Sequence, residues 1–168
     1  MHHLVIAQCI QNLKQIETYL NKAEQFAAGK KFDVAVLVND QLAPDMRNFI
    51  YQVQSACDYV KAGAAWLSGQ RPPKHEDNEK NIADLRARLQ KTIAFAESVT
   101  EAQYIGAHDR KIGWPGEPGK LLAGDDYLLQ IVVPNTLFHI TMAYAILRHN
   151  GVKLGKRDYL GSLRLIEG

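Results

Sequence analysis

The chain has little of what marks several large classes of protein. It has 2 cysteines in 168 residues, and both Cys9 and Cys57 fall within apolar helical patterns. This excludes a disulfide framework and favours two buried thiols in a reducing compartment. The N-terminal stretch lacks the positive start of a signal peptide, and the apolar run at 137–147 is too short to cross a bilayer. We therefore expect a cytoplasmic protein with no membrane partner.

An excess of charge of either sign is also missing. The 20 basic and 18 acidic residues are scattered along the chain and leave a net charge of +2. Without a dense basic block, the sequence does not favour a nucleic-acid partner. There is no internal repeat, no phosphate-binding loop ending in Gly-Lys-Ser/Thr and no nucleophile elbow. Two common routes to an enzymatic function, the phosphate-binding loop and the nucleophile elbow, are therefore unsupported.

What the chain does have is apolar residues at helical spacing in four long segments, at residues 5–27, 43–69, 76–99 and 126–150. Gly29 is expected to end the first segment and Pro44 to lie in the opening turn of the second. Asp77 is expected to cap the third. The fourth is expected to begin at Asp125 or Asp126, to be kinked or split at Pro134, and to end at Gly151.

Shorter segments complete the expected fold. Residues 34–38 could form a strand, but no partner strand lies nearby, so a helical turn is the better interpretation. Residues 110–124 hold two short strands around a Pro/Gly turn, a possible β-hairpin between the third and fourth helices. The prediction is a single all-α domain, residues 1–168, built as a four-helix bundle.

His139 is the one imidazole in the most apolar run, where only His139 and Thr141 interrupt residues 137–147. Because the fourth helix is apolar nearly all round, we expect it to be the most enclosed and His139 to be interior and neutral. His139 could then be a metal ligand, a hydrogen-bonded core residue, or a polar contact of a small-molecule pocket together with Asn135. Its helical neighbours at three and four residues, Asn135, Thr136, Met142 and Ala143, include no strong ligand for zinc or nickel.

The second helix supplies the other candidate polar residues. Asp58 can pair with Lys61 or with an arginine of the third helix, and a structural ion pair is the simpler reading than a catalytic carboxylate. Tyr59 shares a face with Gln52 and is either a core phenol or part of a cavity wall. The pocket candidates are therefore Gln52, Asp58, Tyr59, Asn135 and His139. The histidines in terminal or loop positions are expected to be solvated: His2, His3, His75 and His108.

Several stretches resemble a bacterial family of uncharacterised proteins within the DinB-like (DinB/YfiT) metalloenzyme superfamily. They are LAPDM (42–46), QVQSACD (52–58), ARLQKTIAF (87–95), PNTLFHITMAYAILRHNGV (134–152) and LGKRDYLG (154–161). The resemblance covers nearly the whole chain and implies an up-down-down-up order of the four helices. It also implies pairing of two copies, so we expect a homodimer built on helical contacts.

The same resemblance identifies what this chain lacks. Metal-binding members of the superfamily use one histidine of the second helix and an H-x-x-x-H pair of the last. His139 matches the first histidine of that pair, Ala143 replaces the second, and the second helix offers only Tyr59 or Asp58. The three-histidine site is therefore not carried over. No cofactor is assigned, and binding of a divalent metal by another set of ligands is left as an open alternative.

Two hypotheses about function follow. The first is a non-enzymatic ligand-binding or interaction protein with a degenerate metal site. The alternative is a metal-dependent, transferase-like or hydrolase-like enzyme with a non-standard site around His139.

Overall fold

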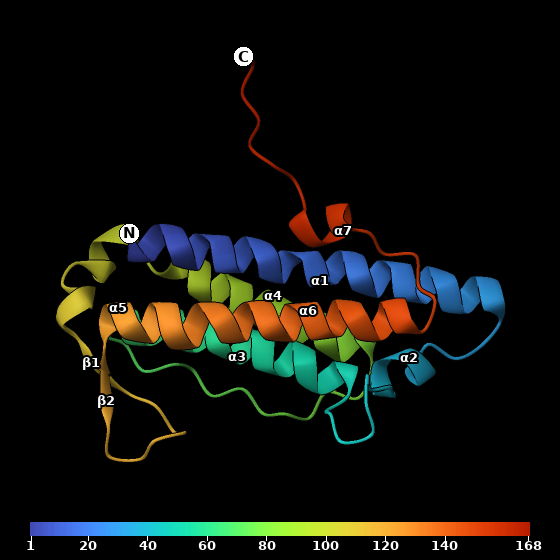
Figure 1. The fold of residues 1–168 in the computed structure, drawn as a ribbon, viewed down its shortest axis with the longest axis horizontal. Coiled ribbons are helices and arrows are strands. Elements are labelled where there is room, and N and C mark those ends of the chain that lie inside the picture. The colour runs from blue at the N-terminus through green and yellow to red at the C-terminus, as the bar shows by residue number, and fades with distance from the viewer.

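Four long helices form the bundle in the computed structural model, which describes residues 1–168 (Figure 1). They are α1 (His2–Lys30), α3 (Phe49–Leu67), α4 (Ile82–Ser98) and α6 (Val133–His149). In Figure 1, α1 and α6 run in one direction while α3 and α4 run in the other. The all-α fold and the up-down-down-up order expected from the sequence are confirmed.

The shorter elements are α2 (Ala35–Asn39), η1 (Glu101–Tyr104), η2 (Ala107–Asp109), β1 (Lys111–Gly113), β2 (Leu121–Ala123), α5 (Gly124–Asp126), η3 (Tyr127–Val132) and α7 (Lys156–Leu160). The predicted hairpin is present: β1 and β2 are antiparallel, with Ile112 opposite Leu122. The helical turn predicted within residues 34–38 is present as α2. Leu37 and Val38 of α2 and Ile112 of β1 join the core, but most core residues belong to the long helices.

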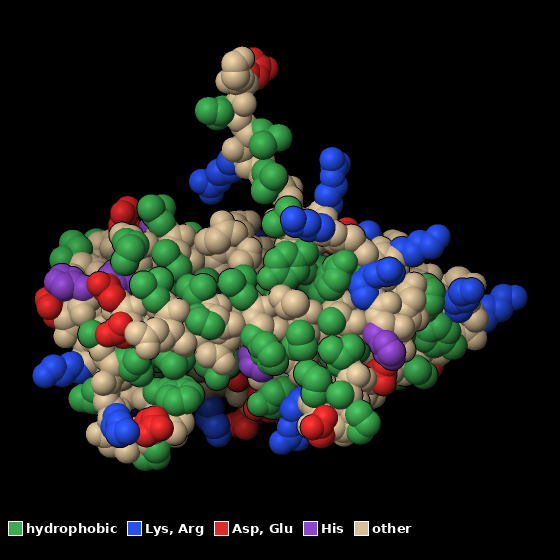
Figure 2. Space-filling model, viewed as in Figure 1, with side chains coloured by type: hydrophobic (Ala, Val, Ile, Leu, Met, Phe, Trp, Pro, Cys, Tyr) green, Lys and Arg blue, Asp and Glu red, His purple; other side chains and the backbone are tan.

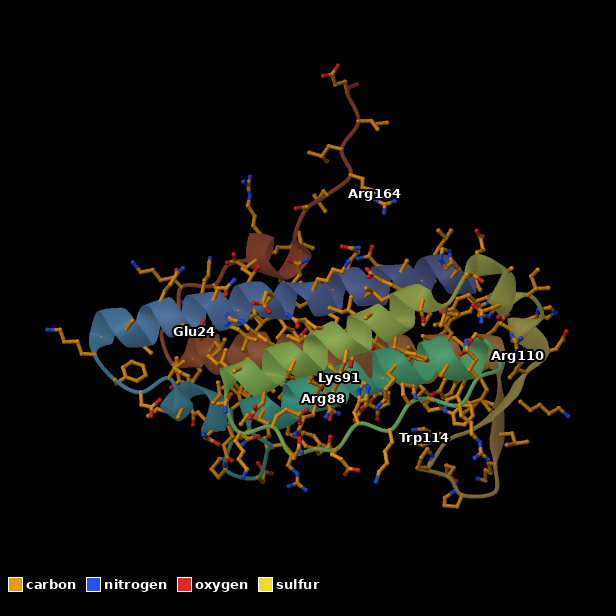
Figure 3. All side chains as sticks on the ribbon, turned by 180° about the vertical axis from the view of Figure 1, so that it is seen from behind. Glu24, Arg88, Lys91, Arg110, Trp114 and Arg164 are labelled. Atoms are coloured by element: carbon orange, nitrogen blue, oxygen red, sulfur yellow. The ribbon has the colours of Figure 1, made fainter.

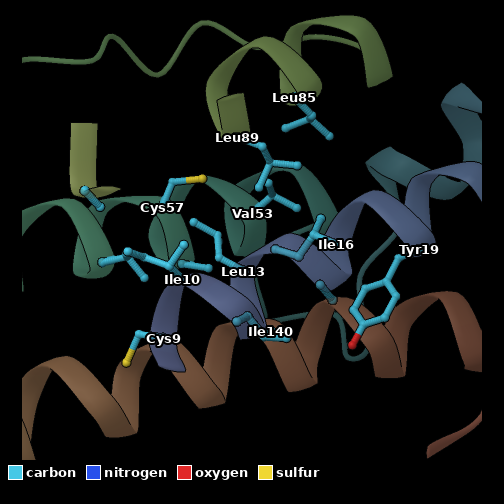
Figure 4. Packing of buried hydrophobic residues seen from close by; sticks show 14 of the residues in the cluster. Cys9, Ile10, Leu13, Ile16, Tyr19, Val53, Cys57, Leu85, Leu89 and Ile140 are labelled. Carbon is cyan, nitrogen blue, oxygen red and sulfur yellow. The ribbon is translucent and has the colours of Figure 1, made fainter. Parts of the chain in front are cut away.

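One core runs between the four long helices, as Figure 4 shows. Its residues include Ile10, Leu13, Ile16 and Tyr19 of α1, Val53 and Cys57 of α3, Leu85 and Leu89 of α4, and Ile140 of α6. Full burial of one such aliphatic side chain contributes about 1.5–3 kcal/mol. Burial raises the pKa of Cys57 to about 12 and that of Cys9 to about 11. Both cysteines are thus free, protonated core residues, as expected.

α3 begins later than its apolar pattern indicates. The helix starts at Phe49, where the side chain of Asn48 accepts a hydrogen bond from the backbone N–H of Tyr51 at 3.0 Å. The predicted start near Pro44 is wrong, because Pro44 lies in the turn that precedes this cap. An apolar pattern continues through such a turn, whereas only the capping contact marks the first helical residue.

Two helix ends use a left-handed residue. Gly151, with φ +91°, follows α6 as predicted. The prediction for α1 is wrong by two positions, because Lys31, with φ 60°, and not Gly29, adopts the left-handed conformation. The N–H of Lys31 donates to the carbonyl oxygen of Ala28 at 3.2 Å, which satisfies one of the free carbonyls of the last turn.

The last helix runs without a break from Gly124 to His149 through α5, η3 and α6. Pro134 therefore does not split it, and the residues just before the proline form the π-helical turns of η3 instead. Neither Asp125 nor Asp126 caps its start, so that prediction is wrong. Asp125 Oδ1 lies 2.7 Å from Nε2 of buried His2, and Asp126 accepts from Gln130 at 2.8 Å. His2 is thus not solvated, contrary to expectation.

A long connection lets α4 run parallel to α3. We call residues 68–81, which connect the two helices, the strap, because they return along the lower edge of the bundle below α3 (Figure 1). An extended segment of this size spans about 40 Å. The 19 residues of α3 span only about 28 Å as a helix. The strap ends at Asn81, whose side chain accepts from the N–H of Asp84 at 3.0 Å and so caps α4.

Arg88 of α4 holds the strap against α3 (Figure 3). Its guanidinium is fully buried and lies 2.9 Å from Asp58 of α3, 2.9 Å from Asp77 and 3.1 Å from Glu79 of the strap. Gln54 donates to the second oxygen of Glu79 at 2.9 Å. Asp77 therefore binds Arg88 and does not cap α4, which corrects the predicted start of this helix.

The ion cluster stabilises the charged form of its most buried carboxylate. Burial by itself would raise the pKa of Glu79, but hydrogen bonds from Gln54, its own backbone and Arg88 together lower that pKa below its ordinary value. Asp58 also accepts from Lys61 at 2.7 Å. Both ion pairs expected for Asp58, with Lys61 and with an arginine of α4, are therefore present.

His75 of the strap makes stability depend on pH. Its Nδ1 lies 3.5 Å from the hydroxyl oxygen of Thr92. Burial, followed by the positive charges of Lys61, Lys91 and Arg88, lowers its pKa from 6.5 to about 4. His75 is therefore partly enclosed and not solvated as expected.

Because the unfolded chain binds this proton at higher pH than the folded chain, stability should fall as pH drops from 6.5 towards about 4. We expect His75→Gln to lose less stability than the wild type between pH 7 and pH 5, as measured by urea unfolding. The exposed His108→Gln is the control and should follow the wild type. Equal losses in all three proteins would contradict the assignment.

Candidate functional site

The candidate site is built where α6 faces α3. Nδ1 of His139 lies 2.8 Å from Oε1 of Gln52, which is 2% exposed. Gln52 is fixed in turn, because its Nε2 donates to the carbonyl oxygen of Arg47 at 2.9 Å. The backbone at the start of α3 thus orients an amide on α3, and that amide orients an imidazole on α6.

This chain of contacts defines the proton on the imidazole. Since Nε2 of Gln52 is the donor to Arg47, Oε1 is an acceptor, and Nδ1 of His139 must carry the hydrogen. Burial lowers the pKa of His139 below its ordinary value, so the ring is neutral at pH 7. Its Nε2 consequently holds a lone pair, and no side chain in the structure hydrogen-bonds to it.

Aromatic rings surround the imidazole. Tyr59 of α3 stacks on it with ring centroids 5.8 Å apart and an angle of 14° between the planes. Tyr51 of α3 and Phe138 of α6 meet it edge-on, at 6.1 Å and 5.2 Å. Burial, followed by the nearby Tyr51 and Asp58, raises the pKa of Tyr59, so its phenol is neutral. The site therefore presents flat apolar walls and one hydrogen-bond acceptor.

A hollow of about 500 Å³ adjoins this aromatic cluster and shares Tyr51 with it. Its lining includes two cations, Arg47 and Lys80, and neither forms an ion pair within the chain. The guanidinium carbon of Arg47 lies 5.3 Å from the ring centroid of Tyr51. Glu79 also lines the hollow, but its charge is balanced by Arg88. The hollow is therefore electropositive.

The structure brings together three of the five pocket candidates: Gln52, Tyr59 and His139. The other two lie elsewhere. Asp58 belongs to the ion cluster of Arg88, and Asn135 donates to the carbonyl oxygen of Ile131 at 2.7 Å within its own helix. Asn135 makes no hydrogen bond to His139, and its expected role as a second polar contact of the same pocket stays a prediction.

Tyr51, Phe138 and Arg47 belong to the site but were not among the candidates. One sequence signal could have indicated the first of them. Tyr51 lies eight residues before Tyr59, a spacing that places both on neighbouring parts of one helix surface. No sequence pattern indicated Arg47. It precedes α3, so helical spacing does not apply to it, and the turn into the helix brings its guanidinium over Tyr51.

The last helix is less enclosed than predicted, and His139 is half-buried. The inner side of this helix packs against α1 and α3, but only 33% of its most apolar 18-residue stretch is buried. By length and composition this helix could cross a membrane, but the core helices of soluble bundles meet the same two criteria. Its outer side carries what we call the α6 stripe: Pro134, Leu137, Phe138, Thr141 and Ala145. Apolar residues on both sides of a helix misled the prediction, because one bundle covers only one side.

The donor set around His139 does not fit the three-histidine metal site of the superfamily that the sequence resembles. On α3 the residue opposite His139 is Gln52, and neither Tyr59 nor Asp58 takes that place as a ligand. Ala143, at the position of the second histidine, is a buried methyl group. No group of three or more His, Cys, Asp or Glu side chains anywhere in the chain could hold a metal ion. A single imidazole falls short of the three or four protein donors of a stable zinc site.

The order of the four long helices defines a DinB-like bundle. A solved structure with the same fold supports this class: the crystal structure of a DinB family member protein from Shewanella denitrificans, at 1.83 Å resolution. It is 43% identical, has a TM-score of 0.94, and the match covers 99% of this chain and 95% of that one.

The chain belongs to the family described as a domain of unknown function, DUF1993, which matches residues 1–160. The comparison with curated proteins gives no match.

Proposed function

We propose that this protein binds a small aromatic molecule at His139 and is not an enzyme. The observation that carries the proposal is the contact between Nδ1 of His139 and Oε1 of Gln52, at 2.8 Å. It orients the imidazole and leaves Nε2 as a neutral acceptor beside Tyr51, Tyr59 and Phe138. A ligand that fits has a flat ring and an N–H or O–H donor.

The adjoining hollow extends this description of the ligand. Arg47 and Lys80 on its wall are unpaired cations, so a ligand that reaches from the rings into the hollow would carry a carboxylate or another anionic group. A cytoplasmic location is part of the proposal, supported by the two free, buried cysteines.

Indole-3-acetate has all three properties and is a suitable probe. We expect saturable binding by isothermal titration, weakened roughly fivefold for the 1-methyl derivative, which has lost one neutral hydrogen-bond donor. Binding should also weaken in His139→Ala and Arg47→Gln. Lys74→Gln, at an exposed position outside the hollow, is the matched control and should bind as the wild type. Equal affinity for indole-3-acetate and its 1-methyl derivative would show that Nε2 is not the acceptor.

A metal-dependent enzyme is the second candidate, favoured only by the free lone pair on Nε2. Nickel and zinc titration of untagged protein separates the two. We expect no saturable binding, because one imidazole is one ligand. A 1:1 complex of sub-micromolar affinity that is lost in His139→Ala would overturn the binding-protein proposal and support the enzyme.

A further inference from the structure

The C-terminal segment leaves the body of the protein. We call residues 162–168 the arm; it extends away from the bundle in Figures 1 and 2. Its apolar side chains are open to solvent: Leu163 is 61%, Leu165 84% and Ile166 93% exposed. No hydrogen bond joins the arm to the rest of the chain. Three large apolar side chains so exposed are unfavourable unless another surface covers them.

The base of the arm is fixed, so its direction is set by the fold. Asp158 of α7 accepts from Lys22 at 2.8 Å and from the backbone N–H of Gly155 at 2.7 Å. Tyr159 packs edge-on against Tyr144, with centroids 6.3 Å apart. Gly161, with φ +69°, then turns the chain outward. The arm is therefore aimed away from its own bundle by an anchored helix.

The α6 stripe is the second uncovered apolar surface of the same chain. Its members recur at three and four residue steps, the spacing of a helix face that packs against another element. Phe138 is 51% exposed, and residues 127–147 include no Asp, Glu, Lys or Arg. Thr141 of the stripe donates to the phenol oxygen of Tyr159 at 3.1 Å, so α7 and the base of the arm lie at its edge.

We infer that two copies of this chain pair by exchanging arms, with each arm lying on the α6 stripe of the other copy. A twofold dimer would cover both surfaces twice, whereas a monomer leaves both exposed. The extended arm spans about 20 Å, enough to cross a partner helix of about 10–12 Å diameter.

The inference goes beyond the ligand proposal, since it concerns a second copy of the chain and does not involve Gln52 or Tyr59. Phe138 is the one residue that the α6 stripe shares with the ligand site.

Sedimentation of the full chain and of two variants tests the dimer. One variant replaces Leu163, Leu165 and Ile166 of the arm by serine, and the other is Phe138→Lys in the stripe. We expect a wild-type dimer at tens of micromolar and at least a tenfold rise in the dimer dissociation constant in each variant. Ile105→Lys, at a position 78% exposed and outside both surfaces, is the control and should stay dimeric.

Mixing the two variants tests the exchange itself. In a mixed dimer, the intact arm of the stripe variant can lie on the intact stripe of the arm variant. A homodimer of either variant has no such intact pair. Native mass spectrometry should therefore show the mixed dimer in excess over both homodimers. A statistical mixture would overturn the exchange, and a wild-type monomer would overturn the dimer. A monomer that sediments with phosphatidylglycerol vesicles through its arm would assign the arm to a membrane instead, and would also overturn the inference.

Discussion

Arg88→Met should destabilise the protein by about 3–5 kcal/mol, the usual cost of removing one partner from a buried ion pair. The guanidinium is fully buried, and it balances Glu79, whose side chain is only 4% exposed. Without it, Glu79 must stay buried without a cation or leave with the strap. Urea unfolding followed by circular dichroism measures the change, and the strap should become a site of proteolysis at neutral pH.

Arg86→Met is a matched control two positions away. Arg86 pairs with Glu17 and Glu24, but it is 25% exposed and both carboxylates are 44% exposed. Loss of such surface pairs costs about 1 kcal/mol or less each. The double variant Arg88→Met/Glu79→Gln should recover part of the loss, because no uncompensated charge is then buried. If Arg86→Met and Arg88→Met were equally stable, the buried cluster would not hold the strap.

Gly124→Ala should cost about 3 kcal/mol or more, at the upper end for inserting a methyl group into a packed site. Gly124 lies where β2 leads into α5, against the backbone of Ala107 in η2. A Cβ there would lie 2.8 Å from the carbonyl carbon of Ala107 and closer still to its oxygen. A backbone atom cannot rotate away, so the last helix or η2 must shift.

Gly29→Ala provides the comparison for Gly124→Ala. Gly29 lies within α1, and nothing approaches within 4 Å of where its Cβ would stand. Replacing a helical glycine by alanine at an open position stabilises by up to about 1 kcal/mol. Thermal unfolding should therefore move in opposite directions for the two variants. A Gly124→Ala protein as stable as the wild type would show that η2 does not pack against this glycine.

The four long helices could be predicted because each carries an apolar stripe at helical spacing, and that stripe is read from neighbouring residues alone. Their starts could not be predicted as well. Asn48 and Asn81 cap α3 and α4 through contacts that no apolar pattern records. Asp77 has the chemistry of a cap, but the fold places it 2.9 Å from Arg88. The contact with Arg88, which is distant in the sequence, thus overrides the local tendency of Asp77 to cap a helix.

By itself, the sequence determined that the protein is a helical bundle with one imidazole in the apolar run of its last helix and no second histidine one turn away. It also determined that this imidazole would be neutral, since an apolar helix disfavours charge. Only the tertiary structure decided that Gln52 meets His139, that Tyr51 and Phe138 join Tyr59 around it, and that the outer side of α6 stays uncovered. Periodicity reports which side of a helix is apolar. Which residues then meet depends on how the helices cross, and that is set by packing between segments far apart in the chain.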